Sequence, residues 1–166
     1  MVRVYLIRHA AAFERDARRW PDDRLRPLTP DGMRKFRKAA AGLERLAGTV
    51  TCVLTSPLVR ARQTAEILAT AACWAPATEA PELAPGHTPA QVLAVMRTQS
   101  AESFALVGHE PGLSDLLAAS VVGPEARFAC QLKKGGAACL NFAAAVRVGR
   151  ARLDWLITPK ALRSLA

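Results

Sequence analysis

Val2-Arg3-Val4-Tyr5-Leu6-Ile7-Arg8-His9-Ala10 stands at the front of the chain and decides how the rest is interpreted. Its middle is apolar, contains β-branched residues and has the length of a strand, and it ends abruptly in a cation and an imidazole. We therefore expect a buried strand that delivers Arg8 and His9 to the carboxyl edge of a sheet, where open α/β folds bind their ligands. Taken alone, the pair favours a charged strand end facing water, so the functional interpretation depends on the rest of the chain.

The length and composition of the chain indicate one globular unit. With 166 residues, 51% of them hydrophobic and 22% charged, the chain is long enough for one well-buried domain, and we expect residues 1–166 to form it. Its apolar runs are far shorter than the ~20 residues of a membrane helix. The front of the chain lacks the apolar region of a secretory signal, so a cytoplasmic protein without a membrane partner is expected.

The net charge of +9 raises the question of a nucleic-acid partner. Aromatic residues make up only 5% of the chain, and its basic residues do not interleave with them as stacking platforms would require. We expect no nucleic-acid partner and interpret most cations, including Lys133 and Lys134, as solvated. The four cysteines form no C-x-x-C pair, so neither a zinc site nor a disulfide framework is predicted.

Capping signals and apolar periodicity divide the chain into alternating strands and helices. Thr29 as N-cap, Pro30 in the first turn and Gly48 at the end delimit one clear helix. Residues 10–28 lack any period and are expected to form a long, functional loop. The other elements expected are strands at 50–55, 103–108, 137–144 and 151–157, a short strand within 75–83, and helices at 58–72, from Thr88-Pro89 onward and at 113–122.

This alternation predicts the fold class. Strands that alternate with helices form a mostly parallel sheet with helices on both faces, a three-layer α/β/α sandwich. The last two strands are joined around Val148-Gly149-Arg150 and are expected to add an antiparallel hairpin at one edge.

Polar side chains follow three of the predicted strands where each strand ends. Arg8 and His9 end the first, the segment 55–64 follows the second and carries Arg60, and His109 ends the fourth. Because the carboxyl ends of parallel strands meet at one edge, these groups can converge. Two histidines and at least two arginines around one point would form a dense positive pocket, and an oxyanion such as phosphate would offset their repulsion.

The ordered motifs of the chain resemble those of the histidine phosphatase superfamily, which has a phosphoglycerate mutase-like fold. Several details are most similar to the SixA-type phosphohistidine phosphatases within it. The matching segments, in order, are Arg8-His9, Arg26-Pro27-Leu28-Thr29 with Gly32, Ser56-Pro57 with Arg60-Ala61 and Gln63-Thr64-Ala65, Pro81 to Gly86, Val107 to Pro111, Leu132 to Gly135, and Trp155 to Pro159. The resemblance spans nearly the whole chain. One departure is Ala10, which stands where the family commonly has glycine.

The resemblance implies a role for each residue of the pocket. His9 would attack phosphorus in line and become a transient phosphohistidine, Arg8 and Arg60 would hold the equatorial oxygens, and His109 would donate a further hydrogen bond to them. Guanidinium groups match phosphate oxygens, and two nearby arginines disfavour the imidazolium form of His9. The protein's own cations would replace metal ions, so no metal and no cofactor are expected.

Two further positions are weaker candidates. Glu82, after the third predicted strand, is the candidate leaving-group acid by resemblance, or else a solvated loop carboxylate. Arg26 either contacts phosphate or substrate at the entrance or is one more surface arginine. Arg62 is expected to form surface pairs, His87 to be a loop histidine, and Glu110 receives no catalytic role.

The resemblance implies a metal-independent phosphatase for phosphohistidine in proteins. Alternatives are a phosphatase for small phosphoesters such as sugar phosphates, and a non-catalytic phosphate-binding scaffold. The expected partner is accordingly a phosphohistidine-bearing protein or a small phosphoester. The scaffold ranks below the enzymes because a scaffold would be free to lose His9, Arg8, Arg60 or His109, and all are present.

Overall fold

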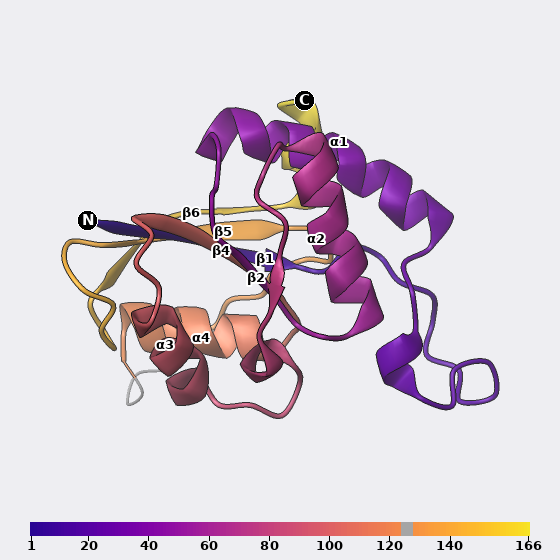
Figure 1. Ribbon diagram of the computed structural model, residues 1–166, viewed down its shortest axis with the longest axis horizontal. Coiled ribbons are helices and arrows are strands. Elements are labelled where there is room, and N and C mark those ends of the chain that lie inside the picture. The colour runs from indigo at the N-terminus through magenta and orange to yellow at the C-terminus, as the bar shows by residue number, and fades with distance from the viewer. Residues whose placement is uncertain (124–127) are drawn as a thin grey trace.

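Figure 1 shows the computed structural model, which describes residues 1–123 and 128–166. A six-stranded sheet lies at its centre. The strands are β1 (Val2–Arg8), β2 (Val53–Thr55), β3 (Thr78–Glu79), β4 (Ser103–Gly108), β5 (Ala137–Phe142) and β6 (Ala151–Ile157). The helices are α1 (Pro30–Ala47), α2 (Val59–Ala71), α3 (Pro89–Arg97), α4 (Gly112–Val121) and α5 (Pro159–Ser164), with 3₁₀ helices at Asp23–Leu25 and Pro81–Leu83.

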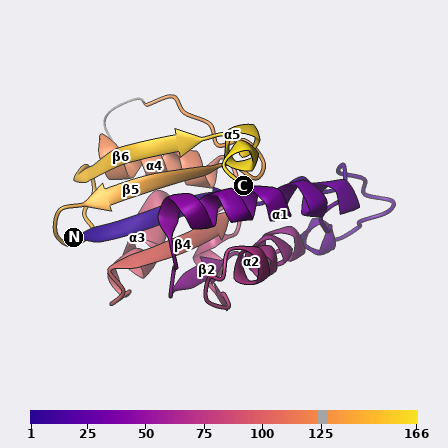
Figure 2. The same ribbon diagram turned by 90° about the horizontal axis from the view of Figure 1, so that it is seen from above.

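The strand order is β3-β2-β4-β1-β5-β6, and β1 to β4 run parallel (Figure 2). Strand β5 runs antiparallel to β1, and β6 antiparallel to β5, so the predicted edge hairpin is confirmed. The register pairs Arg8 with Gly108. The residues that follow, His9 and His109, therefore leave the sheet side by side.

Helices cover both faces of the sheet, which confirms the predicted three-layer sandwich (Figure 1). Tyr5 and Ile7 of β1 point into a core shared with α1, α2 and α5. Val4 and Leu6 point into the opposite core, which α3 and α4 complete. Successive strand residues face opposite sides, so a strand covered on both is apolar along its length.

Helix α1 begins and ends where its capping signals predict. The Thr29 hydroxyl accepts a hydrogen bond from the Gly32 amide at 2.9 Å, and Gly48 ends the helix with φ of +69°. Gly32 also allows a close approach, since a Cβ there would collide with the carbonyl oxygen of Ala11. The start of α1 is thereby packed against the chain just beyond His9.

The structure differs from the expected elements at β2 and after β6. Strand β2 is shorter than predicted, whereas β3 is confirmed as a short strand within residues 75–83 and is followed by a 3₁₀ helix from Pro81. Helix α5 was not predicted, although Thr158 caps it and Pro159 opens it, and it packs against α1. Among the described residues, the structure contains no helix with the length and apolarity needed to cross a membrane.

Candidate active site

His9 and His109 meet at the carboxyl edge of the sheet. Their ring centroids lie 5.0 Å apart with a tilt of 52° between the planes. Only 6% of His9 and 5% of His109 is exposed. The His9 amide donates to the carbonyl oxygen of Gly108 at 3.0 Å, which continues the β1–β4 ladder by one residue and sets the two rings against each other.

The hydrogen bond of the His9 ring determines which of its two nitrogens carries the proton and which keeps a free lone pair. Nδ1 lies 2.7 Å from the carbonyl oxygen of Ala10. A carbonyl oxygen only accepts, so Nδ1 carries the ring proton and Nε2 keeps its lone pair. Burial, together with the Arg60 and Arg8 charges, lowers the pKa of His9 to about 3, so the ring is neutral and nucleophilic at physiological pH.

His109 is oriented by Ser56, which lies directly after β2. The Ser56 hydroxyl oxygen lies 2.8 Å from His109 Nε2 and also accepts from the Leu58 amide at 3.3 Å. This arrangement favours donation of the hydroxyl proton to Nε2, which leaves the ring proton on Nδ1. His109 is also neutral, because burial and the neighbouring positive groups lower its pKa to about 2.

Arg8 is held at the end of β1 by the turn that precedes β5. Its Nη1 donates to the carbonyl oxygen of Leu132 at 2.7 Å. The Gly135 amide lies within hydrogen-bonding distance of the carbonyl oxygens of both Arg8 and His9, at 3.1 and 3.0 Å. Glu110 supports this turn, since its Oε1 accepts from the Leu132 amide at 2.6 Å. Glu110 is therefore a positioning residue for Arg8, a role not predicted from the sequence.

Arg60 enters the site from the first turn of α2 and is only 4% exposed. Its Nη1 donates to the carbonyl oxygen of Asp23 at 2.9 Å, and its Nη2 lies 3.2 Å from the carboxylate of the same residue. The Asp23 carboxylate also pairs with Arg26 at 2.8 Å. Hydrogen bonding to Arg26 and to Arg15, together with the Arg60 charge, lowers the pKa of Asp23 to about 2, so it is ionised. Sequence analysis missed Asp23, which lies in the aperiodic loop 10–28.

Three polar groups of the cluster are buried and have no hydrogen-bond partner among the described residues. They are Nε of Arg8, Nε of Arg60 and Nδ1 of His109. Buried donors in native proteins are nearly always paired, so a set without partners indicates a ligand that accepts hydrogen bonds. Both arginines also contribute to the lowered pKa of both histidines, so their charges lie close enough to act on the two rings. The arrangement suits a tetrahedral oxyanion bound beside His9 Nε2.

Gln63 and Thr64 belong to the motif that follows β2, and their side chains hold helix α2 in place through hydrogen bonds. The Thr64 hydroxyl accepts from the Ala10 amide at 3.0 Å and donates to the carbonyl oxygen of Arg60 at 2.7 Å. Gln63 Oε1 accepts from the Leu28 amide at 2.8 Å. These hydrogen bonds attach helix α2 to the end of β1 and to the loop. They fix the position of Arg60 relative to His9.

The weaker candidates lie around this cluster. Glu82 is half-buried and lines a cavity of about 240 Å³ together with His109 and His87, beside the pocket. Arg26 is held by Asp23 and by the carbonyl oxygen of Phe13 at 2.6 Å, so it braces the loop next to Arg60. Arg62 points away and pairs with Glu79 at 3.4 Å, as expected.

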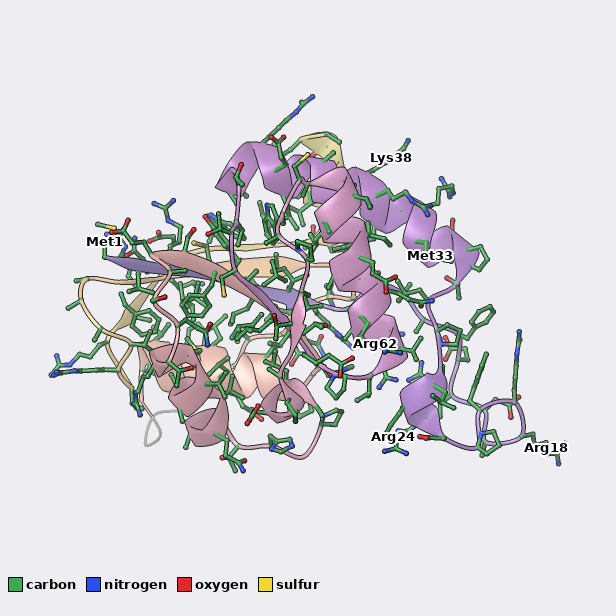
Figure 3. The ribbon with its side chains drawn as sticks, in the orientation of Figure 1. Met1, Arg18, Arg24, Met33, Lys38 and Arg62 are labelled. Carbon is green, nitrogen blue, oxygen red and sulfur yellow. The ribbon has the colours of Figure 1, made fainter. Side chains whose placement is uncertain are left out.

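Most arginines of the loop stand apart from the site. Arg18 and Arg24 project from it into solvent in Figure 3.

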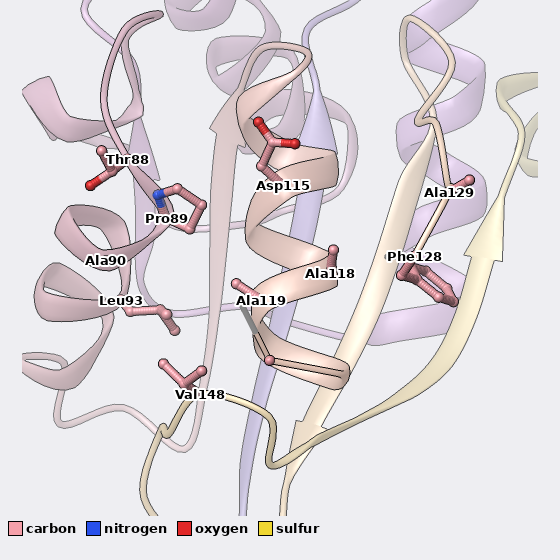
Figure 4. A pocket seen from close by; sticks show the side chains of 11 residues that line it. Thr88, Pro89, Ala90, Leu93, Asp115, Ala118, Ala119, Phe128, Ala129 and Val148 are labelled. Carbon is pink, nitrogen blue, oxygen red and sulfur yellow. The ribbon is translucent and has the colours of Figure 1, made fainter. Parts of the chain in front are cut away.

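A larger cavity of about 630 Å³ lies between α3 and α4 (Figure 4), and its lining within the described chain includes none of the four clustered residues. The described part of the chain contains no group of three or more histidine, cysteine, aspartate or glutamate side chains placed to hold a metal ion.

Comparison with known proteins identifies the family. The profile of the histidine phosphatase superfamily (branch 1) matches residues 4–86. The chain belongs to the histidine phosphatase superfamily. An uncharacterised protein from Picosynechococcus is 36% identical to this superfamily member over 145 residues, which are 86% of each chain. Membership makes the protein a phosphatase, as predicted from the motifs.

Solved structures of the superfamily confirm the fold. The protein histidine phosphatase SixA in complex with tungstate superimposes with a TM-score of 0.81 at 24% identity, over 97% of this chain and 99% of that one. A putative phosphohistidine phosphatase SixA from Nakamurella multipartitia gives 0.78 at 26% identity, over 95% and 96%. A putative α-ribazole-5′-P phosphatase from Escherichia coli gives 0.72 at 18% identity, over 96% and 98%, so the fold alone does not select the substrate.

Proposed function

We propose that this phosphatase hydrolyses phosphohistidine in proteins, without a metal ion, through a covalent phosphohistidine on His9. The observation that carries the proposal is the unprotonated Nε2 of His9 next to three buried groups without partners, on Arg8, Arg60 and His109. Phosphoryl transfer depends mainly on positioning and charge stabilisation, and this cluster supplies both.

In the first step, His9 Nε2 forms a bond to phosphorus while the bond from phosphorus to the substrate nitrogen breaks. Arg8 and Arg60 hold the equatorial oxygens, and His109 Nδ1 donates a hydrogen bond to them. The Nδ1–H of His9 stays on the Ala10 carbonyl oxygen, which stabilises the charge that develops on the ring. The leaving imidazole takes a proton from Glu82 or from water.

In the second step, water attacks the phosphorus of phosphorylated His9. The nitrogen–phosphorus bond breaks, one water proton returns to Glu82 or to solvent, and the other leaves with the inorganic phosphate that is released. Arg8 and Arg60 carry the positive charge that a metal ion supplies in other phosphatases. Because the guanidinium groups are already in place, little reorganisation accompanies the reaction.

The choice of phosphohistidine draws on the likeness to the SixA structures, one of which is 26% identical over nearly the full length of both chains. A phosphatase for small phosphoesters is the second candidate, favoured by the fold it shares with the putative α-ribazole-5′-P phosphatase. Both use the same attack by His9 and differ only in the group that leaves.

The proposal is tested by comparing the wild type with His9→Ala and Arg60→Gln on a phosphohistidine-bearing protein, a sugar phosphate and p-nitrophenyl phosphate, with and without EDTA. We expect His9→Ala to lose on the order of 10³-fold or more of turnover on every substrate. Arg60→Gln should lose about 10²-fold or more. Arg62→Gln is the matched control, since Arg62 lies on the same helix and pairs with Glu79.

Specificity is judged from kcat/KM, which should be highest for the phosphohistidine protein and unchanged by EDTA. Preference for the sugar phosphate would assign the enzyme to small phosphoesters instead. Full activity of His9→Ala would remove His9 from the reaction, and strong inhibition by EDTA would indicate a metal phosphatase.

A further inference from the structure

A third cavity, of about 230 Å³, lies beside Ala10, the residue that follows His9, on the side of α1 and α5. Three cations from separate parts of the chain line it: Lys35 of α1, Lys134 of the turn before β5, and Arg163 of α5. Phe36 and Pro159 contribute apolar atoms to the lining. We refer to it as the basic side cavity.

The basic side cavity adjoins the backbone of the nucleophile. Ala10, which follows His9, lines it, and so does Gly135, whose amide is 3.0 Å from the carbonyl oxygen of His9. The Lys134 charge reaches the ring of His9, where it contributes to the lowered pKa. A protein substrate bound at His9 would therefore pass close to this cavity.

The charges of the cavity are not balanced by the chain. Lys35 pairs with Asp31 at 2.7 Å, and Asp31 also bonds to Arg34. Lys134 and Arg163 make no ion pair within residues 1–123 and 128–166, and no acidic side chain of these residues lines the cavity. Cations gathered at one hollow repel one another, and a bound anion relieves this repulsion.

The kind of anion follows from a contrast with the phosphate pocket. In that pocket the Nε donors of both arginines are buried and have no partner among the described residues, whereas the lysines of the basic side cavity are exposed. Exposed ammonium groups suit a carboxylate on a flexible side chain, which keeps part of its own hydration. The apolar lining also accommodates the methylene groups of such a side chain.

We propose that the basic side cavity binds acidic side chains that flank the phosphohistidine in a protein substrate, so that the enzyme selects phosphohistidines in acidic surroundings. The inference rests on the proposed function and adds to it the class of protein that is recognised. It involves no further covalent step: the carboxylate binds through Lys134 and Arg163 while the phosphoryl group occupies the pocket at His9.

The test uses two phosphohistidine peptides of the same length, one with aspartate and glutamate on both sides of the phosphohistidine and the other with asparagine and glutamine there. The measured quantity is the ratio of kcat/KM for the acidic peptide to kcat/KM for the amide peptide. A ratio is used because any change in chemistry at His9 affects both peptides and cancels. The variants are Lys134→Gln and Arg163→Gln, with Lys133→Gln from the same turn and Lys160→Gln from the same helix as matched controls.

For the wild type we expect a ratio of about 5 or more at low salt, because exposed ion pairs each change affinity by a factor of a few. Lys134→Gln and Arg163→Gln should each lower the ratio, their combination should bring it near one, and the two controls should keep it. High salt should also bring the wild-type ratio near one, since it screens exposed charges.

A wild-type ratio near one at low salt, or a ratio that survives in the double variant, would overturn the inference while leaving the proposed function intact. Hydrolysis of p-nitrophenyl phosphate without hydrolysis of either peptide would overturn the proposed function, and the inference with it. Better turnover of a small bisphosphate than of the acidic peptide would show that the cavity serves a second phosphate, and would also overturn the inference.

Discussion

The rings of His9 and His109 lie 5.0 Å apart because the parallel register of β1 and β4 pairs the residues just before them, Arg8 and Gly108. Two buried imidazoles at this separation, next to two arginines, are stable only in their neutral form. His9 offers the lone pair of Nε2, and His109 offers the N–H of Nδ1, to a ligand bound beside His9. The sheet register thereby creates both the nucleophile and its hydrogen-bond donor.

The first prediction concerns stability against pH. Burial lowers the pKa of His9 to about 3 and that of His109 to about 2, whereas a histidine of the unfolded chain titrates near 6.5. Below about pH 6.5 the unfolded chain therefore binds more protons than the folded one, and the free energy of unfolding decreases as pH falls. Each histidine should contribute roughly 1 kcal/mol per pH unit between about pH 6 and 4.

Urea denaturation at a series of pH values measures this slope. The double variant His9→Gln/His109→Gln should show a shallower slope over the same range, while above pH 7 the histidines contribute no slope in either protein. Equal slopes in wild type and variant would mean that these histidines accept protons in the folded state near their ordinary pKa.

The second prediction concerns Thr64, whose hydroxyl joins the Ala10 amide to the Arg60 carbonyl oxygen. Thr64→Val keeps the shape but leaves the buried amide without a partner, which should cost about 1–3 kcal/mol of unfolding free energy. Turnover should fall as well, because the change loosens Arg60 relative to His9. Thr64→Ser restores the hydroxyl and should recover activity more fully than stability, and failure of this rescue would contradict the role in positioning.

The third prediction concerns oxyanion binding, measured as a shift in melting temperature with inorganic phosphate in the presence of EDTA. At about 100 times its Kd, phosphate should stabilise the wild type by about 2.7 kcal/mol. For a chain of 166 residues this corresponds to roughly 5–10 °C. Arg60→Gln should lose most of the shift and Arg62→Gln should keep it. An equal shift in the two variants would place the anion elsewhere.

The fourth prediction concerns Glu82, which lines the cavity beside His109. If Glu82 protonates the leaving group, Glu82→Gln should slow an alkyl phosphate by about 10²-fold and p-nitrophenyl phosphate much less, since nitrophenolate leaves without a proton. Glu79→Gln is the matched control, because Glu79 is exposed and pairs with Arg62. A uniform decrease on both substrates would indicate that Glu82 shapes the cavity rather than donating a proton.

Local signals predict the elements whose ends are set within a few residues. Thr29, Pro30 and Gly48 delimit α1 because capping is a contact between near neighbours. Strand β2 was predicted from Val50 but pairs with β4 only from Val53, because strand pairing depends on residues far away in the chain. Helix α5 was missed because it is short and depends on packing against α1.

The residues of the candidate site also fall into those that local sequence signals predict and those that only the structure reveals. Arg8, His9, Arg60 and His109 could be selected from the sequence because each lies at the end of a predicted strand or the start of a helix. Asp23 could not, since it lies in a loop without period and acts only through Arg60 and Arg26. Ser56 and Thr64 belonged to a recognised motif, but their hydrogen-bond partners lie far away in the chain.

The sequence by itself determined the order of the six strands and of helices α1 to α4, the family and the residue types that reach the edge of the sheet, because each depends on local patterns of apolar and polar residues. Only the tertiary structure decided which ring nitrogen of His9 is available, which groups of Arg8, Arg60 and His109 are left without partners, and that Lys134 and Arg163 share a cavity. Those properties depend on distances between residues far apart in the chain, and burial in three dimensions fixes both the protonation of the histidines and the hydrogen bonds that remain for a ligand.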